Sequence, residues 1–447
     1  MTGGRLPHLQ ATMACINSLN RFTANRALRS YQLSLSASGS FSCVSPASGK
    51  VVQPCAHYLM PGAGVHYLFG GTAPFVLTAG SLQDGYPLLS IATADGQYRI
   101  GKRQPADLTQ QARRLLHDPR CIPVDPSRRP QLHIGDANFA HCIWNEYPAL
   151  LALLDHAPDV ECHLSHDPLG VLRTTCATRN IAIIGLTNRA AARGWSVAPV
   201  VMPGSILCGS TALATVHRML TLPAQAPPED SPRIWLTIRD SGRTLENQDA
   251  FLCAVIRAFY TRDRNTTFVL DGFSRPMDLA GVPYDALRPK FSARIAQADA
   301  IAARIMSRLP MANITNVTGS PLRTALAEVS RCAFYVSHAG TMQHKPAWFY
   351  PIPGIIHGNR TSLSPAALRW AAQMVEGSIA PAGITPDIVQ DTEVRGLPVH
   401  NDRNKDYVVT DVPRATAEVL AHFDATRAVG PSPMTAAAQN LRLQPLT

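Results

Sequence analysis

The residues best suited to chemistry lie between Phe334 and Asn359. The first three residues of this stretch are apolar and β-prone, which predicts a strand buried on both faces. A polar turn follows, in which Gly340 lets backbone approach a ligand closely, and Thr341 can cap a helix whose first N–H groups point outward as anion donors. The side chains expected to serve the same anion are Ser337, His338, Gln343, His344 and Lys345. This pattern predicts a cradle for a diphosphate; the alternative is an ordinary strand–loop–helix corner around a core histidine.

Two arginines form a second candidate for phosphate binding. Arg239 and Arg243 follow the predicted strand from Ile234 to Ile238, and guanidinium groups bind phosphate bidentately. The alternative is a pair of surface charges. Farther along, Asn247 is expected to cap a helix. Asp271, at the end of the next strand, either contacts a ribose hydroxyl or forms an Asp-Gly turn.

The elements that must position these residues form two α/β blocks. Predicted strands alternate with helices from Gln131 to Met202 and again from Ile234 onward, which predicts a parallel sheet in each block. Open sheets of this kind bind ligands in the crevice outside the carboxyl ends of their strands. The proline-rich segment from Pro223 to Pro232 is the predicted linker between the blocks.

The first 125 residues differ from the α/β blocks. They are rich in Ser, Gly and Thr, and short apolar or alternating runs predict strands and hairpins without evident chemistry. The runs are Tyr31 to Phe41, His66 to Phe69, Phe75 to Leu77 and Leu88 to Ile91. The expected domains are a β-rich region at 1–125, Rossmann-like domains at 126–222 and 232–428, and a disordered tail at 429–447.

Composition limits the partners. The chain has 447 residues, of which 46% are hydrophobic and 16% charged, as in ordinary soluble globular proteins with two or three domains. Its formal net charge of +10 favours anionic partners such as phosphorylated small molecules or an acidic membrane surface. Nucleic acid is disfavoured, because the basic residues are scattered and aromatic residues make up only 6%.

The ten cysteines show neither a C-x-x-C pair nor a zinc-like spacing, so they are expected to be buried small residues in a reducing compartment. The first twenty residues lack the apolar core of a signal peptide, and no stretch reaches the length of a membrane span. We therefore expect a cytoplasmic location. The N-glycosylation sequons at Asn265, Asn313, Asn316 and Asn359 would matter only in a secreted chain.

Three segments together resemble one family, the glycosyltransferase family 61 type and its bacterial polysaccharide-biosynthesis relatives. The family motifs are Asn-x-x-His-x-x-(His/aromatic)-(Asp/Asn)-(Glu/Asp)-x-(x)-Pro, Arg-x-x-x-Arg-x-x-x-Asn and His-Gly-Ala-Gly-Leu. The corresponding segments here are Asn138-Phe-Ala-His141-Cys-Ile-Trp-Asn145-Glu146-Tyr-Pro148, Arg239-Asp-Ser-Gly-Arg243-Thr-Leu-Glu-Asn247 and the stretch around Gly340. In the third segment His338 stands where a glycine is usual, and Ser337 where the family histidine stands. The resemblance covers about residues 131 to 360.

The two-block layout and the resemblance imply a fold and an activity. The expected fold is α/β, with two facing Rossmann-like domains of the GT-B type and an amino-terminal β-rich extension. The implied activity moves a sugar, with inversion, from a nucleotide-sugar donor in the carboxy-terminal half to a glycan or lipid-linked acceptor in surface polysaccharide or glycolipid biosynthesis. No Asp-x-Asp pair ends a strand convincingly, so neither a metal nor a cofactor is expected, and cationic side chains and a helix N-terminus should neutralise the leaving diphosphate.

Sugar transfer also needs a base to activate the acceptor hydroxyl. Glu146 is the first candidate and His141 its competitor, because both lie near the start of the predicted helix from Asn138 to Leu154. Residues five apart lie about 140° apart around a helix, so the two cannot both point at one hydroxyl. One of them is then structural: a helix-start histidine bonded to backbone, or a glutamate on a solvated face. Asn138 is expected to cap the helix.

Two other functions stay open at this stage. A nucleotide-sugar epimerase, or another nucleotide-dependent transferase, can use the same scaffold, since fold does not fix function. A non-catalytic protein that binds sugar nucleotides or glycans is the third hypothesis, and the displaced histidine of the third segment supports it. The positive charge suits peripheral contact with an anionic membrane that carries a lipid-linked acceptor.

Overall fold

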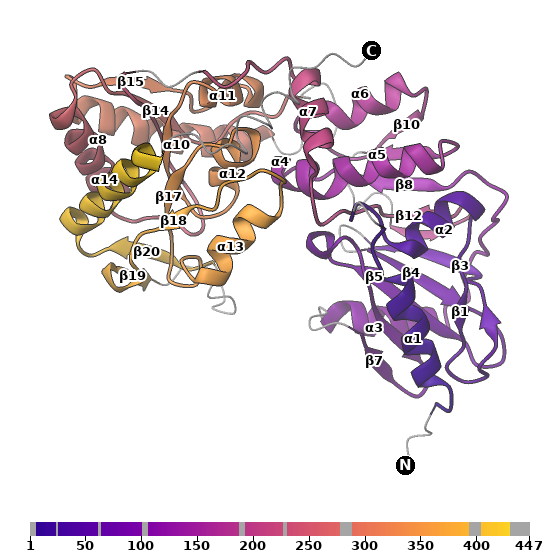
Figure 1. Ribbon diagram of the computed structural model, residues 1–447. Helices are drawn as coiled ribbons and strands as arrows, with labels where there is room; N and C mark the ends of the chain where they lie inside the picture. Colours follow the sequence, from indigo (N-terminus) through magenta and orange to yellow (C-terminus); the bar gives the residue numbers. More distant parts are fainter. Residues whose placement is uncertain are drawn as a thin grey trace. The chain divides into compact units, whose positions relative to one another are not determined.

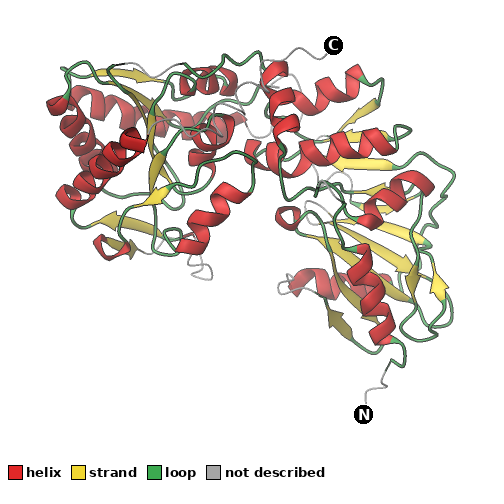
Figure 2. Ribbon diagram, in the orientation of Figure 1, coloured by secondary structure: helices red, strands yellow, loops and turns green. Residues whose placement is uncertain are grey.

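The computed structural model describes residues 6–23, 26–60, 64–100, 106–186, 193–226, 230–277, 288–392 and 404–429. These residues divide into two compact units: unit 1 ends at Ala212 and unit 2 begins at Leu213, inside helix α7 (Ser210–Met219). Figures 1 and 2 show the elements of each unit. The tail predicted at 429–447 lies, except for its first residue, outside the described residues.

A four-stranded parallel sheet carries the site residues of unit 1. Its order is β10-β9-β8-β12, with β8 (Gln131–Ile134), β9 (Glu161–Leu164), β10 (Ala182–Gly185) and β12 (Val200–Val201). The chain leaves β8 into a continuous helical segment made of α4 (Phe139–His141), the π-helical turn η2 (Cys142–Glu146) and α5 (Tyr147–His156). Helix α6 (Val171–Thr178) connects β9 to β10. The predicted parallel sheet and its first helix are therefore confirmed.

The β-rich region forms a six-stranded antiparallel sheet, in the order β11-β3-β4-β5-β6-β7. The strands are β3 (Ala56–Met60), β4 (Gly64–Phe69), β5 (Phe75–Gly80), β6 (Leu88–Thr93), β7 (Gln97–Arg99) and β11 (Gly194–Ser196). The smaller elements are α1 (Leu9–Leu19), the hairpin of β1 (Cys43–Val44) and β2 (Val51–Val52), η1 (Leu82–Asp84) and α3 (Ala106–Leu115). The structure confirms the strands predicted from His66 to Ile91.

The strand predicted from Tyr31 to Phe41 is wrong, because most of this stretch is helix α2 (Ser30–Ser38). The N–H of Arg29 donates to Oε1 of Gln32 at 2.8 Å, which closes the first turn, and Gly39 ends the helix with a left-handed φ of 70°. Tyr31 and Leu35, one helical turn apart, are both fully buried. Tertiary packing along that face outweighs the alternating local pattern.

One short segment joins the two sheets of unit 1. Strand β11 pairs with β3 of the antiparallel sheet, and β12, four residues later, pairs with β8 of the parallel sheet. Between them the N–H of Val200 donates to Nδ1 of His57 at 3.0 Å. The β-rich region and the parallel sheet therefore fold as one compact unit.

Unit 2 contains a six-stranded parallel sheet in the order β15-β14-β13-β16-β17-β18. The strands are β13 (Arg233–Thr237), β14 (Thr267–Asp271), β15 (Asn313–Asn316), β16 (Phe334–His338), β17 (Gly354–His357) and β18 (Ala382–Gly383). Numbered along the chain, this order is 3-2-1-4-5-6, the doubly wound order of the Rossmann fold. The predicted fold class, α/β with Rossmann-like sheets and a β-rich amino-terminal region, is confirmed.

Helices cover both faces of this sheet (Figure 1). The helices of unit 2 are α8 (Gln248–Arg262), α10 (Arg288–Arg308), α11 (Leu322–Val329), α12 (Thr341–Phe349), α13 (Pro365–Gln373), η4 (Pro386–Ile388) and α14 (Val412–Val429). Helix α14 follows the antiparallel pair β19 (Val389–Thr392) and β20 (Asp406–Val409), and packs on α8 through an edge-to-face contact of Phe423 with Phe259. In the part of the chain that the structure describes, no helix is both long and apolar enough to span a membrane.

Candidate functional site

The strand order of unit 2 places a ligand crevice between two neighbouring strands. β13 and β16 pair directly, and the chain leaves them in opposite directions, toward β14 and β17. Ligands of open α/β sheets bind at this point, outside the carboxyl ends of the strands. The loop after β13 carries Arg239 and Arg243, and the loop after β16 carries Gly340. The structure thus brings two of the three predicted segments to one edge of one sheet.

Gly340 is held in a conformation that requires glycine. Its φ of 101° and ψ of −146° lie in a region essentially reserved for glycine, and it occupies the N-cap position of α12. A Cβ at Gly340 would lie 2.9 Å from Nη1 of Arg243. The Arg243 guanidinium therefore lies against the bare backbone at the start of α12. Thr341 is the first helical residue, and no side chain caps the helix, so the prediction that Thr341 is its cap was wrong.

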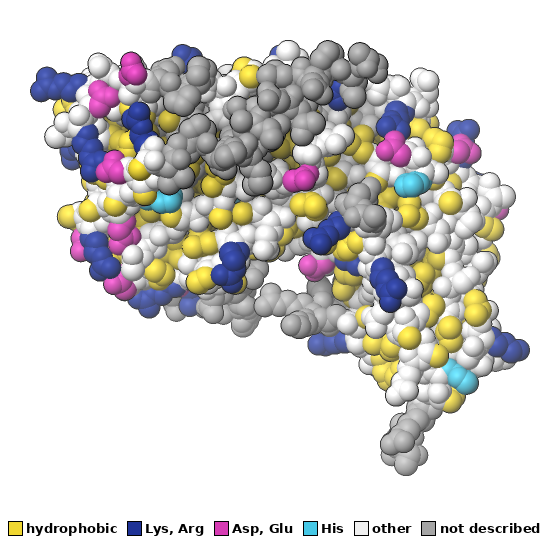
Figure 3. Space-filling model, viewed as in Figure 1, with side chains coloured by type: hydrophobic (Ala, Val, Ile, Leu, Met, Phe, Trp, Pro, Cys, Tyr) yellow, Lys and Arg dark blue, Asp and Glu magenta, His cyan; other side chains and the backbone are white. Residues whose placement is uncertain are grey.

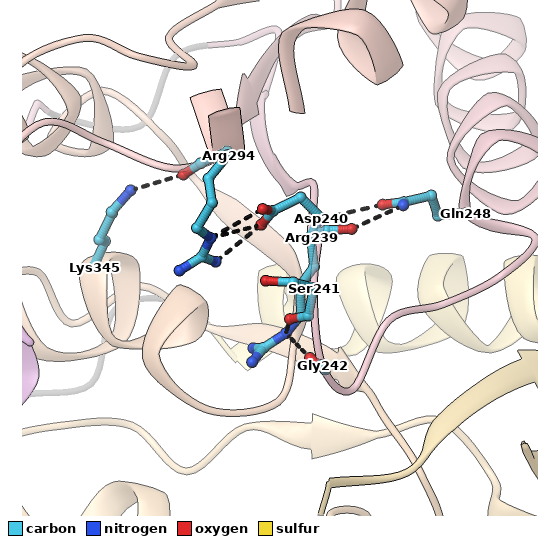
Figure 4. A network of polar contacts seen from close by, with 8 residues as sticks. Arg239, Asp240, Ser241, Gly242, Gln248, Arg294 and Lys345 are labelled. Carbon is cyan, nitrogen blue, oxygen red and sulfur yellow. Dashed lines mark hydrogen bonds and ion pairs between the residues drawn. The ribbon is translucent and has the colours of Figure 1, made fainter. Parts of the chain in front are cut away.

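Arg239 is a partly buried cation that is held by backbone. Its Nε donates to the carbonyls of Ser241, at 3.2 Å, and Gly242, so the loop curls around its guanidinium (Figure 4). Burial, and secondly the charge of Arg243, lowers the pKa of Arg239 to about 10. No carboxylate among the described residues forms an ion pair with Arg239 within 4 Å.

Asp240, the carboxylate nearest in sequence, is turned away from this arginine (Figure 4). Its Oδ2 accepts from Nε of Arg294 at 2.9 Å, and its Oδ1 accepts from Nη2 at the same distance. The Arg294 guanidinium also lies over the ring of Phe273, 4.5 Å from its centroid. Because Arg294 engages both oxygens of Asp240, the positive charge of Arg239 is left for another partner.

The backbone of Arg239 is fixed as well. Its N–H donates to Oε1 of Gln248 at 3.2 Å, and its carbonyl accepts from Nε2 of the same side chain at 2.9 Å. Arg243 and Gly242 both have left-handed φ values, 59° and 57°, which is uncommon for a residue with a side chain. The Gln248 side chain thus fixes the backbone of Arg239 in the loop that also carries Arg243.

Ser337 and His338, predicted to bind the phosphate, are fully buried at the end of β16. The hydroxyl of Ser337 donates to the carbonyl of His338 at 3.1 Å, and the N–H of His338 donates to Oγ1 of Thr237 at 2.9 Å. Burial lowers the pKa of His338 well below its usual range, so its ring is neutral. Both residues are buried in the sheet, and their direct contact with a ligand stays a prediction.

A second buried histidine packs against His338. His357, at the end of β17, has its ring centroid 4.3 Å from that of His338, and its Nδ1 lies 2.7 Å from the hydroxyl oxygen of Tyr407. Burial also lowers the pKa of His357, to about 3. The side chains of His338, His357 and Tyr407 thus join β16, β17 and β20 in one buried cluster.

The structure gives Lys345 a partner other than the predicted phosphate. Its Nζ donates to both oxygens of Asp271, at 2.7 and 2.8 Å, and to Oγ of Ser274 at 2.8 Å. Both charged side chains are buried, and burial raises the pKa of Asp271 while Lys345 opposes the rise. These three acceptors match the three N–H donors of an ammonium. We therefore revise both predictions: Lys345 and Asp271 form an ion pair that ties α12 to the end of β14. Lys345 is then not free for a phosphate, and Asp271 is not free for a ribose.

Gln343 and His344 also lie inside the protein. Gln343 is 1% exposed and His344 is 4% exposed, and the His344 ring stacks on Trp348 with centroids 3.6 Å apart. They anchor α12 to the core. Of the residues predicted around the diphosphate, the partly exposed ones are Arg239, Arg243, Gly340 and Thr341.

In unit 1, Glu146 is a buried carboxylate that closes the loop after β8. Its Oε1 accepts from the N–H of Gly135 at 3.0 Å, and its Oε2 accepts from the N–H of Asp136 at 2.9 Å. The residue is 1% exposed. The sequence predicted that Glu146 is either a base or part of a solvated helical face. In the structure its carboxylate accepts hydrogen bonds from two backbone N–H groups.

His141 differs from Glu146 in its exposure to solvent. It is partly exposed, its ring stacks on Trp144, and its Nδ1 lies 2.9 Å from Oδ1 of Asn145. Asn145 was not predicted as its partner, although a histidine and an asparagine four residues apart on a helix share a face. Asn138 caps this helix as predicted, because its Oδ1 accepts from the N–H of Ala140 at 3.0 Å.

Asn247 stands at the N-cap position of α8, but its side chain does not cap the helix. It pairs instead with Val409 of β20, donating to the carbonyl at 2.8 Å and accepting from the N–H at 3.2 Å. The predicted side-chain cap is therefore wrong. Within the described ranges, no group of three or more His, Cys, Asp or Glu side chains is arranged to hold a metal ion.

No protein-family model and no curated protein matches the chain, so membership of family 61 stays a prediction. Solved structures that are similar in part include a glycosyl transferase of family 9 from Veillonella parvula, with 12% identity, coverage of 52% of this chain and 80% of that chain, and a TM-score of 0.27. The iron-containing dodecameric glycosyltransferase TibC from enterotoxigenic E. coli shares 10% identity over 86% of this chain and 94% of that one, with a TM-score of 0.32. The catalytic domain of starch synthase IV from Arabidopsis thaliana, bound to ADP and acarbose, shares 9% identity over 98% and 92%, with a TM-score of 0.24. At these TM-scores the likeness carries no argument about the function of this chain, which must be inferred from the site itself.

Proposed function

We propose that this chain is a glycosyltransferase, which moves a sugar from a nucleotide-sugar donor to a hydroxyl of a glycan or lipid-linked acceptor. The observation that carries the proposal is the pair Arg239 and Arg243 at the Rossmann switch point of unit 2, beside the start of α12. Fixed guanidinium groups and a helix N-terminus are donors suited to a diphosphate.

The charge balance of the crevice supports an anionic ligand. Arg294 forms an ion pair with Asp240, and Lys345 forms one with Asp271, so these two carboxylates already have cationic partners. In the described part of the chain, the Arg239 guanidinium donates to backbone carbonyls. Burial lowers its pKa, and the charge of Arg243 lowers it further. Two neighbouring cations repel each other, and a bound diphosphate removes this repulsion while accepting their hydrogen bonds.

The same groups suit the chemistry of a leaving diphosphate. When the bond from the anomeric carbon to the diphosphate oxygen breaks, negative charge grows on that oxygen, and cations fixed in place stabilise it without reorganisation. In this proposal the arginines do the work that a divalent cation does elsewhere, and the reaction is a single inverting displacement. The donor site of this proposal lies in unit 2.

The setting of the reaction is also part of the proposal. We assign it to polysaccharide or glycolipid biosynthesis, with peripheral contact to an anionic membrane. On the face drawn in Figure 3, Lys and Arg side chains are spread out rather than gathered in one patch. Such contact would therefore be weak and salt-sensitive, and sedimentation with anionic vesicles at low and high salt measures it.

A thermal-shift panel of nucleoside mono- and diphosphates and their sugar conjugates tests the donor site. Binding at 100 times Kd adds about 2.7 kcal/mol to the free energy of unfolding. We expect one nucleoside diphosphate to raise the Tm of the parent protein and of Arg262→Ala, which removes an exposed arginine paired with Asp424, but not that of Arg243→Ala. No shift with any nucleotide, from folded protein, would contradict the proposal. Release of an epimerised sugar nucleotide without any acceptor would favour the epimerase instead.

A further inference from the structure

The loop after β13, which carries both arginines, ends beside β20. The N–H of Glu246 donates to the carbonyl of Tyr407 at 2.9 Å, and the N–H of Tyr407 donates to the carbonyl of Thr244 at 3.0 Å. Leu245, between these two loop residues, forms a parallel bridge with Tyr407. The end of the loop is therefore held against β20 by main-chain hydrogen bonds.

A side chain of β20 fixes the residue directly after Arg243. The N–H of Thr244 donates to Oδ1 of Asp406 at 2.6 Å. Asp406 is the first residue of β20 and is partly buried. A hydrogen bond from an N–H to a carboxylate is stronger than one between neutral groups. Asp406 therefore holds the backbone at the peptide that links Arg243 to Thr244.

A second side chain fixes the start of the arginine segment. Gln248 bonds both the N–H and the carbonyl of Arg239, as Figure 4 shows. Gln248 is itself buried. The five residues from Arg239 to Arg243 therefore lie between two side-chain anchors, Gln248 and Asp406.

The two anchors belong to elements that are joined to each other. Asn247, the residue before Gln248, donates to the carbonyl of Val409 in β20 and accepts from its N–H. The hydroxyl of Thr392 in β19 donates to Oε1 of Glu246 at 2.6 Å. The start of α8 and the pair β19–β20 thus form one hydrogen-bonded frame around the loop.

This frame surrounds a backbone conformation that is uncommon for arginine. Arg243 has a left-handed φ of 59°. Such conformations persist in residues with a side chain where the surrounding structure determines them. In this conformation the Arg243 guanidinium lies beside the start of α12, where a Cβ on Gly340 would lie 2.9 Å from Nη1. The position of this cation therefore depends on the frame.

We infer that Asp406 is a positioning residue of the donor site, which keeps Arg243 in place for the diphosphate through its hydrogen bond to the N–H of Thr244. This inference rests on the proposed function, and all of its residues belong to unit 2. By its charge alone, a carboxylate beside the loop would weaken the binding of an anion. Charge and position therefore predict opposite effects when Asp406 is removed.

Titration calorimetry measures the effect on Kd. The probes are the nucleoside diphosphates of the thermal-shift panel and inorganic pyrophosphate, which carries the group that they share. Asp406→Ala should raise Kd by about 10–100-fold, the effect of removing a residue that orients a metal ligand. Asp406→Asn keeps an oxygen that accepts from the N–H of Thr244, so its Kd should stay near the parent value. A Kd for Asp406→Ala at or below the parent value overturns the inference.

Asp387→Ala is the matched control. It removes an exposed carboxylate of the same unit, paired with Arg414, and so changes the net charge by the same amount as Asp406→Ala. Its Kd should equal that of the parent. A rise in Kd as large as that of Asp406→Ala would trace the effect to net charge and overturn the inference.

A double variant shows whether Asp406 acts through Arg243. In the Arg243→Ala background, Asp406→Ala should cause no further rise in Kd, because the cation that it positions is absent. Two substitutions whose effects on binding add in full would show that Asp406 acts independently of Arg243, which overturns the inference.

Amide hydrogen exchange gives a readout that needs no substitution. In the ligand-free parent protein, the N–H of Thr244 should exchange as slowly as the N–H of Tyr407, which bonds the same loop, because both belong to one frame. A Thr244 amide that exchanges as fast as in an unfolded chain overturns the inference, even if Asp406→Ala does not fold.

These outcomes separate the inference from the proposed function. If Asp406→Ala binds nucleotide as the parent does, while Arg243→Ala does not, the role of Asp406 is removed and the proposed function stands. A folded parent that binds neither a nucleoside diphosphate nor pyrophosphate removes the proposed function, and the role of Asp406 with it.

Discussion

Replacing Gly340 by alanine tests how the phosphate crevice is assembled. The new Cβ would lie 2.9 Å from Nη1 and 3.3 Å from Nη2 of Arg243, at a residue whose φ is 101°. Holding alanine in this backbone region costs about 1–3 kcal/mol, and the guanidinium must also move. We expect the free energy of unfolding to fall by about that amount and the affinity for the nucleoside diphosphate to fall by tenfold or more, since a loss of about 1.4 kcal/mol in binding is tenfold in Kd.

Gly377→Ala is the matched control for backbone strain. Gly377 lies in the same unit with a φ of 79°, and a Cβ there would meet no atom within 4 Å. The Gly377→Ala substitution should therefore lower the free energy of unfolding, measured by urea denaturation. It should not change the Kd for the nucleoside diphosphate, measured by titration calorimetry. A Gly340→Ala protein that binds nucleotide with parent affinity would refute the placement of Arg243 against the start of α12 as part of the ligand site.

Three further predictions concern buried polar groups. Lys345→Met leaves the fully buried Asp271 carboxylate unpaired and should lower the free energy of unfolding by about 3–5 kcal/mol. The double variant Lys345→Met with Asp271→Leu should recover most of the lost stability. If Lys345→Met instead weakened nucleotide binding and left stability unchanged, Lys345 would be a phosphate ligand. Glu146→Gln directs an amide N–H₂ at one of two backbone N–H donors and should lower stability by about 1–3 kcal/mol; a large fall in kcat at parent stability would instead make Glu146 the base. Burial lowers the pKa of His66 from 6.5 to about 3, so between these pH values the unfolded chain binds one more proton than the folded chain. Stability should then fall as pH falls through this window, and His66→Gln should reduce the slope by about 1.4 kcal/mol per pH unit in urea denaturation; an unchanged slope would show that His66 titrates normally.

The elements that depend on local pattern could be predicted from the sequence. The apolar run at Phe334–Val336, the glycine that follows it and the alternation of strands with helices predicted β16, the crevice loop and a parallel sheet, and the structure has all three. These features are set by residues close together in the chain.

The elements that depend on distant partners could not be predicted. Lys345 pairs with Asp271, 74 residues away, and Asp240 pairs with Arg294, 54 residues away, so the sequence does not show which cations are already neutralised. The stretch from Tyr31 to Phe41 alternates like a strand, yet packing of Tyr31 and Leu35 makes most of it helical. Burial likewise distinguishes Glu146 from His141, and burial is a property of the whole fold.

Calorimetric titration of the nucleoside diphosphate identified by the thermal-shift panel tests the central claim most directly. The proteins to compare are the parent, Arg239→Ala, Arg243→Ala and the Arg262→Ala control. If the two crevice arginines hold the diphosphate, each crevice substitution should raise Kd by at least tenfold, the loss expected for a charge-assisted hydrogen bond of about 1.5–3 kcal/mol, and the control should match the parent. Equal affinities in all four proteins would contradict the assignment of the donor site to the switch point of unit 2.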